Sequence, residues 1–222
     1  MPNLCDNTLE VSADPKNREA LKQLKDFVDN SIFEDGDRFT FEGVLPMPKE
    51  LDIPCRFPKT EELEALEKAN IEKHGHPNWY DWRIEKWGTK WDAYDCYQND
   101  LQLDYVCLGF YTAWSPPLPY YKALSEKYPL LSIDIEYSEP GGDFAGTEKY
   151  QGGELLEEEH YTYSLYEFTH DNDYWWEKME DAIEDGSWTL EEFKDMCSDV
   201  WSAMDTEERK ELVNLFKQSE AV

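Results

Sequence analysis

Four carboxylates follow one another at helical spacing in the C-terminal part of the chain: Glu177, Glu180, Asp181 and Glu184. Side chains three or four residues apart lie about 5–6 Å from each other on a helix surface. Successive phosphates of one DNA strand have a similar spacing, so such a row can imitate a nucleic-acid backbone. We therefore expect this row to bind a basic protein surface, together with a second group of carboxylates: Glu157, Glu158, Glu159, Glu191 and Asp195.

The charge of the chain is concentrated where these carboxylates lie. The 222 residues include 50 Asp+Glu and 21 Lys+Arg, which gives a formal net charge of −29. Residues 134–222 contain 26 acidic and 6 basic residues, a net charge of −20. Direct binding to nucleic acid is excluded, because it requires an excess of Lys and Arg. The alternative to phosphate mimicry is an acidic face that only keeps the protein soluble, and the sequence leaves both interpretations open.

Other residue types that could perform chemistry do not form a recognisable site. Residues 181–192 partly fit a calcium-binding loop, but Ile183 occupies a ligand position and cannot coordinate calcium. His74 and His76 lack a third histidine nearby, and His160 and His170 are interpreted as ordinary histidines. No nucleophile and base stand together. We therefore expect a protein that is not an enzyme, with no catalytic residue, no cofactor and no metal.

Tryptophan is unusually frequent around the middle of the chain, at Trp79, Trp82, Trp87, Trp91 and Trp114. These rings could form part of the core or could line a ligand groove. The second hypothesis for function is accordingly a small-ligand, nucleotide-type binding module whose pocket is lined by Trp82, Trp87 and Trp114. A third hypothesis is a regulatory subunit whose helical tail docks a partner through Trp188 or Trp201.

The elements that would position these residues can be predicted from periodicity and from capping residues. Residues 8–13 alternate between apolar and polar types, as a strand does, and Asp14-Pro15 opens a helix. Phe39-Thr40-Phe41 alternates again and is predicted to complete a first β-α-β unit. A second unit comprises a strand at 105–111, a helix capped by Ser115 and a strand at 131–137. A further strand or hairpin is expected across residues 144–166.

Two β-α-β units predict an α+β fold of the ferredoxin-like type. Its domain is expected to span residues 1–165, with a helical insertion at about 49–100. Residues 166–222 are predicted to form an acidic helical region. Within it, Trp176, Met179 and Ile183 are expected to face inward, and Thr189 is expected to open a helix through a capping box.

Several segments resemble the YubB-type ferredoxin-like family of phage and plasmid proteins. They are residues 78–92 (NWYDWRIEKWGTKWD), 112–117 (TAWSPP), 124–129 (LSEKYP) and 139–146 (EPGGDFAG). The resemblance covers roughly residues 1–165. It implies a ferredoxin-like domain and an origin in a mobile element, and it implies no established activity.

The leading hypothesis is a non-enzymatic phage or plasmid interaction protein. It would inhibit a host nucleic-acid-binding or defence protein, of restriction or CRISPR type, by presenting an acidic surface that resembles DNA. The mean hydropathy of −0.80 argues against a membrane span. The N-terminus has no basic and apolar signal segment, and the five cysteines are an odd number. We therefore expect the protein in the host cell cytosol.

Overall fold

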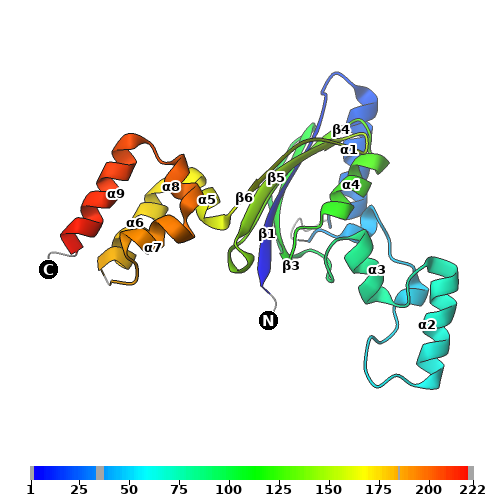
Figure 1. The fold of residues 1–222 in the computed structure, drawn as a ribbon. Helices are drawn as coiled ribbons and strands as arrows, with labels where there is room; N and C mark the ends of the chain where they lie inside the picture. Colours follow the sequence, from blue (N-terminus) through cyan, green and yellow to red (C-terminus); the bar gives the residue numbers. More distant parts are fainter. Residues whose placement is uncertain (1–2, 34–37, 185, 220–222) are drawn as a thin grey trace. The chain divides into compact units, whose positions relative to one another are not determined.

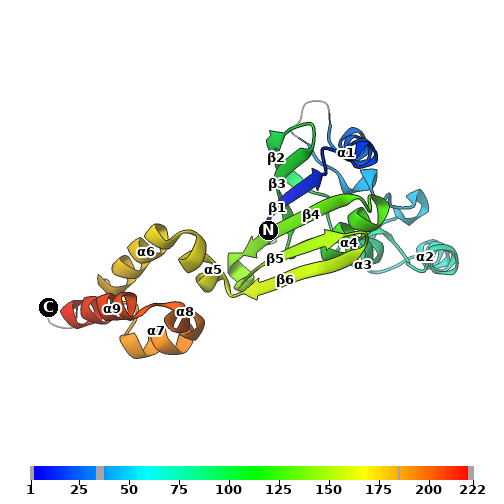
Figure 2. The same ribbon diagram turned by 90° about the horizontal axis from the view of Figure 1, so that it is seen from above.

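The computed structural model describes residues 3–33, 38–184 and 186–219. Its frame is a six-stranded sheet with the strand order β2-β3-β1-β4-β5-β6 (Figures 1 and 2). The strands are β1 (Leu4–Ala13), β2 (Tyr94–Leu101), β3 (Tyr105–Ala113), β4 (Leu131–Glu139), β5 (Phe144–Gln151) and β6 (Glu154–Tyr161). The chain divides into an N-terminal unit, residues 1–142 and 147–159, and a C-terminal unit, residues 143–146 and 160–222.

The connections between the first four strands confirm the ferredoxin-like prediction. Helix α1 (Arg18–Ser31) joins β1 to β2 through a long insertion, and α4 (Leu118–Lys127) joins β3 to β4. β1 is antiparallel to both β3 and β4, and β2 is antiparallel to β3. Both helices cover one face of the sheet (Figure 1). Leu9 and Val11 of β1 point to that face and are fully buried, as the alternation of residues 8–13 predicted.

The prediction of a strand at Phe39–Phe41 is wrong. Phe39 forms only an isolated bridge with Ile32, and Phe41–Gly43 is the short 3-10 helix η1. Both rings are buried, and the Phe39 ring centroid lies 5.1 Å from that of Phe110. The apolar alternation reflects two side chains that enter the core from an irregular segment. The strand that completes the first β-α-β unit is β2, which occupies the end of the segment predicted to be the helical insertion.

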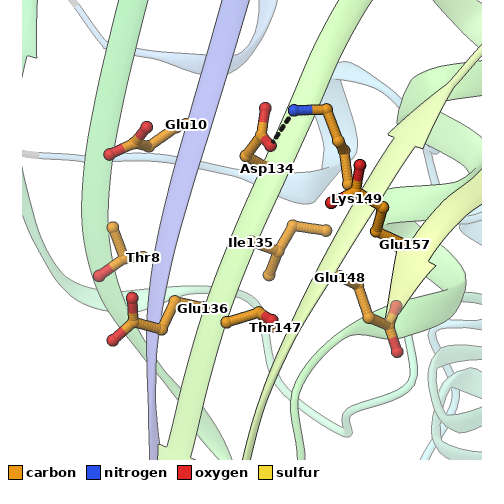
Figure 3. A pocket seen from close by; sticks show the side chains of 9 residues that line it. All are labelled: Thr8, Glu10, Asp134, Ile135, Glu136, Thr147, Glu148, Lys149 and Glu157. Atoms are coloured by element: carbon orange, nitrogen blue, oxygen red, sulfur yellow. Dashed lines mark hydrogen bonds and ion pairs between the residues drawn. The ribbon is translucent and has the colours of Figure 1, made fainter. Parts of the chain in front are cut away.

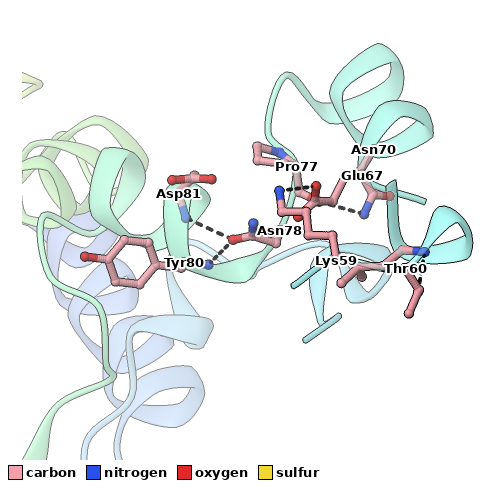
Figure 4. A network of polar contacts seen from close by, with 9 residues as sticks. Lys59, Thr60, Glu67, Asn70, Pro77, Asn78, Tyr80 and Asp81 are labelled. Atoms are coloured by element: carbon pink, nitrogen blue, oxygen red, sulfur yellow. Dashed lines mark hydrogen bonds and ion pairs between the residues drawn. The ribbon is translucent and has the colours of Figure 1, made fainter. Parts of the chain in front are cut away.

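The insertion contains η2 (Lys49–Leu51), α2 (Glu61–His74) and α3 (Trp79–Lys86). Polar contacts hold its helices together (Figure 4). The Asn78 side chain accepts hydrogen bonds at the first turn of α3 and so caps that helix. Asn70 of α2 donates to the Pro77 carbonyl at 3.1 Å, and Lys59 pairs with Glu67 at 2.5 Å. The insertion is therefore an ordered part of the N-terminal unit.

The C-terminal unit contains the helices α5 (Tyr163–His170), α6 (Asn172–Glu184), α7 (Leu190–Met196), α8 (Ser198–Ala203) and α9 (Thr206–Ser219). The short 3-10 helix η3 (Pro140–Gly142), which precedes β5, belongs to the N-terminal unit. Thr189 and Glu192 form the predicted capping box. On α6, Met179 and Ile183 are buried as predicted, but the buried tryptophan is Trp175 rather than Trp176, which is half-buried. None of the helices in the described ranges is long and apolar enough to cross a membrane.

Residues 161–165, at the end of the segment predicted as a strand or hairpin, mark the passage from sheet to helix. β6 ends at Tyr161, and the Thr162 side chain caps α5 by accepting from the Leu165 amide at 3.2 Å. The C-terminal unit includes residues 143–146 as well as the chain from His160 onward, whereas the sequence placed the boundary after residue 165. The predicted hairpin is present as β5 and β6.

Candidate functional site

The carboxylates predicted to bind a partner belong to two different units. Glu157, Glu158 and Glu159 lie on β6 at the edge of the sheet, and all three are exposed. The others belong to helices of the C-terminal unit. The expected acidic field is therefore two sets of residues, each held by its own fold.

The helical set lies on α6 and α7. Glu177, Glu180 and Asp181 are exposed on the side of α6 opposite its buried residues, which is the row that their spacing predicted. Glu191 and Asp195 are exposed on α7. Glu184 ends α6, and its side chain lies outside the described residues.

A denser group of carboxylates lies on the sheet, on the face opposite α1 and α4. We call this group the acidic sheet face and define it by five residues: Asp6 and Glu10 of β1, Asp134 and Glu136 of β4, and Glu157 of β6. Along β1 and β4 these positions alternate with buried apolar residues and are themselves half-buried. Four of the five, all except Asp6, line a pocket of about 250 Å³ (Figure 3).

The pairing of the strands brings like charges together on this face. Glu10 is directly opposite Asp134 in the β1–β4 register, and directly opposed like charges destabilise a sheet. Among the residues that the structure describes, Lys149 of β5 is the only base that lines the pocket, and its Nζ lies 2.6 Å from Asp134 Oδ1. This ion pair relieves part of the repulsion, and Glu10 and Glu136 line the same pocket (Figure 3).

Two pKa shifts follow from this arrangement. Burial raises the pKa of Asp6, and the negative charge of Glu136 raises it further. The hydrogen bond and ion pair with Asp134 raise the pKa of Lys149. The face is thus a place where adding negative charge is unfavourable and where a cation is stabilised.

Asp6 and Glu10 were not identified from the sequence as candidate residues. The signal was present, because Glu10 stands between Leu9 and Val11 in an alternating strand and must point away from the core. What periodicity cannot show is which strand lies beside β1. The pairing with Asp134 appears only once the register is known.

The tryptophans expected to line one pocket are separated by burial. Trp87 is fully buried, its indole nitrogen donates to the Leu45 carbonyl at 2.9 Å, and its ring packs against that of Phe41. Trp82 is also buried, with its ring centroid 5.7 Å from that of Trp87. Trp114 is 45 % exposed. Two of the three rings are therefore core, and of the three only Trp114 is exposed enough to contribute to a ligand site.

The histidine pair His74 and His76 is engaged in local contacts. His76 is buried, with Nε2 2.8 Å from Glu85 Oε2 and Nδ1 2.9 Å from the His74 carbonyl oxygen. Both ring nitrogens of His76 are occupied by protein atoms. The interpretation of His76 as a loop or surface histidine is therefore wrong in one respect, because its side chain is buried.

Part of this chain is similar to a domain of known proteins. No curated protein matches the chain. Among solved structures, that of a protein api92 from Yersinia pseudotuberculosis aligns with a TM-score of 0.42 and 11 % sequence identity, over 72 % of this chain and 98 % of that chain. A family model matches residues 90–185, which run from β2 through the sheet into α6. The chain thus contains a segment similar to the ferredoxin-like domain in Api92-like protein.

Proposed function

We propose that this chain is a non-enzymatic interaction protein whose acidic sheet face binds the basic, nucleic-acid-binding surface of another protein. The observation that carries the proposal is the convergence of five carboxylates from three strands on one face, with Lys149 as the only base lining its pocket. No side-chain arrangement described above favours a chemical reaction.

The spacing of the sheet supports a resemblance to a phosphate backbone. Side chains on the same face of one strand are about 7 Å apart, and neighbouring strands are about 4.8 Å apart. The carboxylates of the acidic sheet face therefore form a two-dimensional array of negative charge at spacings comparable to those of phosphates. Because a sheet is rigid, a partner does not have to order these groups when it binds.

Direct binding of nucleic acid is disfavoured by the same face. Four-stranded sheets of this type that recognise RNA stack bases on aromatic side chains of the open face. Here Tyr111 of β3 lies opposite Asp6 in the β1–β3 register, and its side chain is hydrogen-bonded to that carboxylate. Carboxylates beside the aromatic positions repel phosphates. The fold alone carries no function, and the charge of this face favours a basic protein.

The proposal also names a class of partner. A host protein of restriction or CRISPR type presents the required basic surface, and inhibition would follow from occupation of its nucleic-acid site. The acidic row on α6 would add to long-range attraction, because a net charge of −29 accelerates association with a basic protein.

The test is affinity capture from a host lysate with the full chain as bait. We expect a captured protein that is released by raised salt and by excess duplex DNA. The triple variant Glu10→Gln, Glu136→Gln, Glu157→Gln should lose that protein. A matched variant of α6, namely Glu177→Gln, Glu180→Gln, Asp181→Asn, changes the net charge equally and should retain most of the binding. A partner that duplex DNA cannot displace, or equal losses in the two variants, would contradict the assignment to the sheet face.

A further inference from the structure

One lysine ammonium contacts two partly exposed indole rings beside β3. Lys90 Nζ lies 3.6 Å from the ring centroid of Trp114 and 4.0 Å from that of Trp91. The two tryptophans remain 45 % and 43 % exposed. Cations bind to aromatic faces because the ring face carries negative potential. The pair of rings therefore has a geometry that accepts an organic cation, and its present occupant belongs to the protein itself.

The backbone at Trp114 is strained. Its φ of 73° lies in the left-handed region, which a bulky side chain adopts rarely and at a cost in free energy. The Trp114 amide donates to the Asn3 carbonyl at 3.0 Å, and the neighbouring Ser115 hydroxyl donates to the Gly88 carbonyl at 2.8 Å, which fixes this conformation. A glycine would adopt it without strain. Because nearly half of the side chain is exposed, burial of the ring does not account for a tryptophan at this position.

The charge around the indole pair selects the sign of its ligand. Trp114 directly follows Ala113, which lies opposite Leu4 of β1, and Tyr111 of the same strand lies opposite Asp6 of the acidic sheet face. Trp114 therefore lies three residues along the chain from the partner of Asp6, within the N-terminal unit. A cation is attracted to this region, whereas a nucleotide or another anion is repelled.

We propose that Trp91 and Trp114 form a binding site for an arginine side chain of the basic partner. This identification of the ligand's source rests on the function proposed above. Arginine suits the site better than lysine, because its planar guanidinium stacks on aromatic faces and is less strongly hydrated. Tryptophan and arginine are also the residues that most often supply the binding energy of an interface. The two indole rings would anchor the partner's arginine, while the acidic sheet face attracts its other basic residues.

Lys90 acts as an internal competitor for this site. Within the described residues it forms no ion pair with a carboxylate, so its flexible side chain can leave the rings without breaking one. Replacement by methionine, which is similar in length and uncharged, should therefore open the site to an external cation.

The experiment follows the indole N–H signals of the full chain by NMR. The Lys90→Met variant is titrated with N-acetylarginine amide, and N-acetylcitrulline amide serves as an uncharged probe of nearly the same shape. We expect saturable shifts of the Trp91 and Trp114 signals with the arginine probe only, an affinity several-fold lower in the wild type, and no shift of the buried Trp87. No saturable shift in the variant, or equal shifts with both probes, would overturn the inference.

A second measurement separates this inference from the proposed function. If lysate capture finds a partner that DNA displaces, Trp114→Ala should reduce its affinity by about tenfold or more, and Trp114→Phe should restore part of it. Undiminished binding by Trp114→Ala refutes the inference and leaves the proposed function standing. If no such partner exists, the proposed function fails, and the probe titration alone decides whether the indole pair binds a guanidinium.

Discussion

Lys149 gives the sharpest test of the acidic sheet face, because its removal should lower stability and strengthen binding at once. The Lys149→Gln variant removes the only base that lines the pocket and keeps a polar side chain of similar length. Asp134 then loses its ion pair, keeps the hydrogen bond from the Ser132 hydroxyl, and lies directly opposite Glu10. For a basic partner the same change deepens the negative potential of the surface, so the affinity at low salt should rise.

The stability loss can be estimated from the contacts. The Lys149–Asp134 pair has an N–O distance of 2.6 Å, but its side chains are 36 % and 40 % exposed, so it counts as a surface pair. Such pairs contribute about 0.2–1 kcal/mol. The unrelieved repulsion between Asp134 and Glu10 adds about 0.2–1 kcal/mol. We expect the free energy of unfolding to fall by about 0.5–1.5 kcal/mol, which corresponds to about 1–6 °C in Tm for a chain of this size.

The assay is urea unfolding of the full chain at low salt and at about 1 M NaCl, where the Debye length is about 3 Å. Because the two units can unfold separately, amide hydrogen exchange of β1 and β4 identifies the transition that belongs to the sheet. Lys16→Gln is the matched control: Lys16 is exposed, and the variant makes the same change in net charge. Since the pKa of Lys149 is raised, its stabilising effect persists through neutral pH and is lost as the pH rises through that pKa.

Two results would refute the reasoning. If Lys149→Gln and Lys16→Gln lose the same stability, the loss reflects net charge and not the geometry of the face. If the loss at about 1 M NaCl equals the loss at low salt, it is not electrostatic. Weaker binding by Lys149→Gln would show that Lys149 itself contacts the partner.

Four further outcomes are expected. Asp6→Asn should raise the free energy of unfolding at pH 7, because burial and Glu136 raise the pKa of Asp6; the gain should vanish in acid as the wild-type carboxyl takes up its proton. A thiol reagent should label the exposed Cys55 rapidly and Cys5 only on unfolding, because burial raises the pKa of Cys5 to about 12. Trp87→Ala should cost about 3–5 kcal/mol in urea unfolding, as for other large core truncations. Thr189→Ala removes a capping box and should cost about 0.5–2 kcal/mol, measured by hydrogen exchange in α7.

The parts of the fold that the sequence predicts correctly are those with strong local signals. The prolines before α4 and the alternating β4 define the second β-α-β unit without knowledge of the rest. The predicted cap is wrong, because α4 begins at Leu118 and the Ser115 hydroxyl donates to the Gly88 carbonyl instead. β2 was missed because its residues, YDCYQNDL, are mostly polar, and its pairing with β3 is interrupted by two register shifts. An irregular edge strand has neither the periodicity nor the apolar content on which such predictions depend.

The residues of the candidate site likewise differ in whether they could be predicted from the sequence. The row on α6 could be predicted because helical spacing is a local property. The acidic sheet face could not, because Glu10 and Asp134 become neighbours only through strand pairing. The pair Trp91 and Trp114 could not be singled out from the sequence either. Five tryptophans lie in this part of the chain, and only burial in the folded protein distinguishes the core ring of Trp87 from the exposed ring of Trp114.

The position of the carboxylates bears on whether they serve solubility or binding. Acidic residues that only solvate a protein are best placed at exposed positions, where their mutual repulsion is screened. Asp6, Glu10, Asp134 and Glu136 instead occupy half-buried strand positions, and burial raises the pKa of Asp6. Such an arrangement lowers stability and adds little to solubility. A cationic partner that enters the face would remove that repulsion, so the stability cost of the free protein becomes a gain in affinity for the complex.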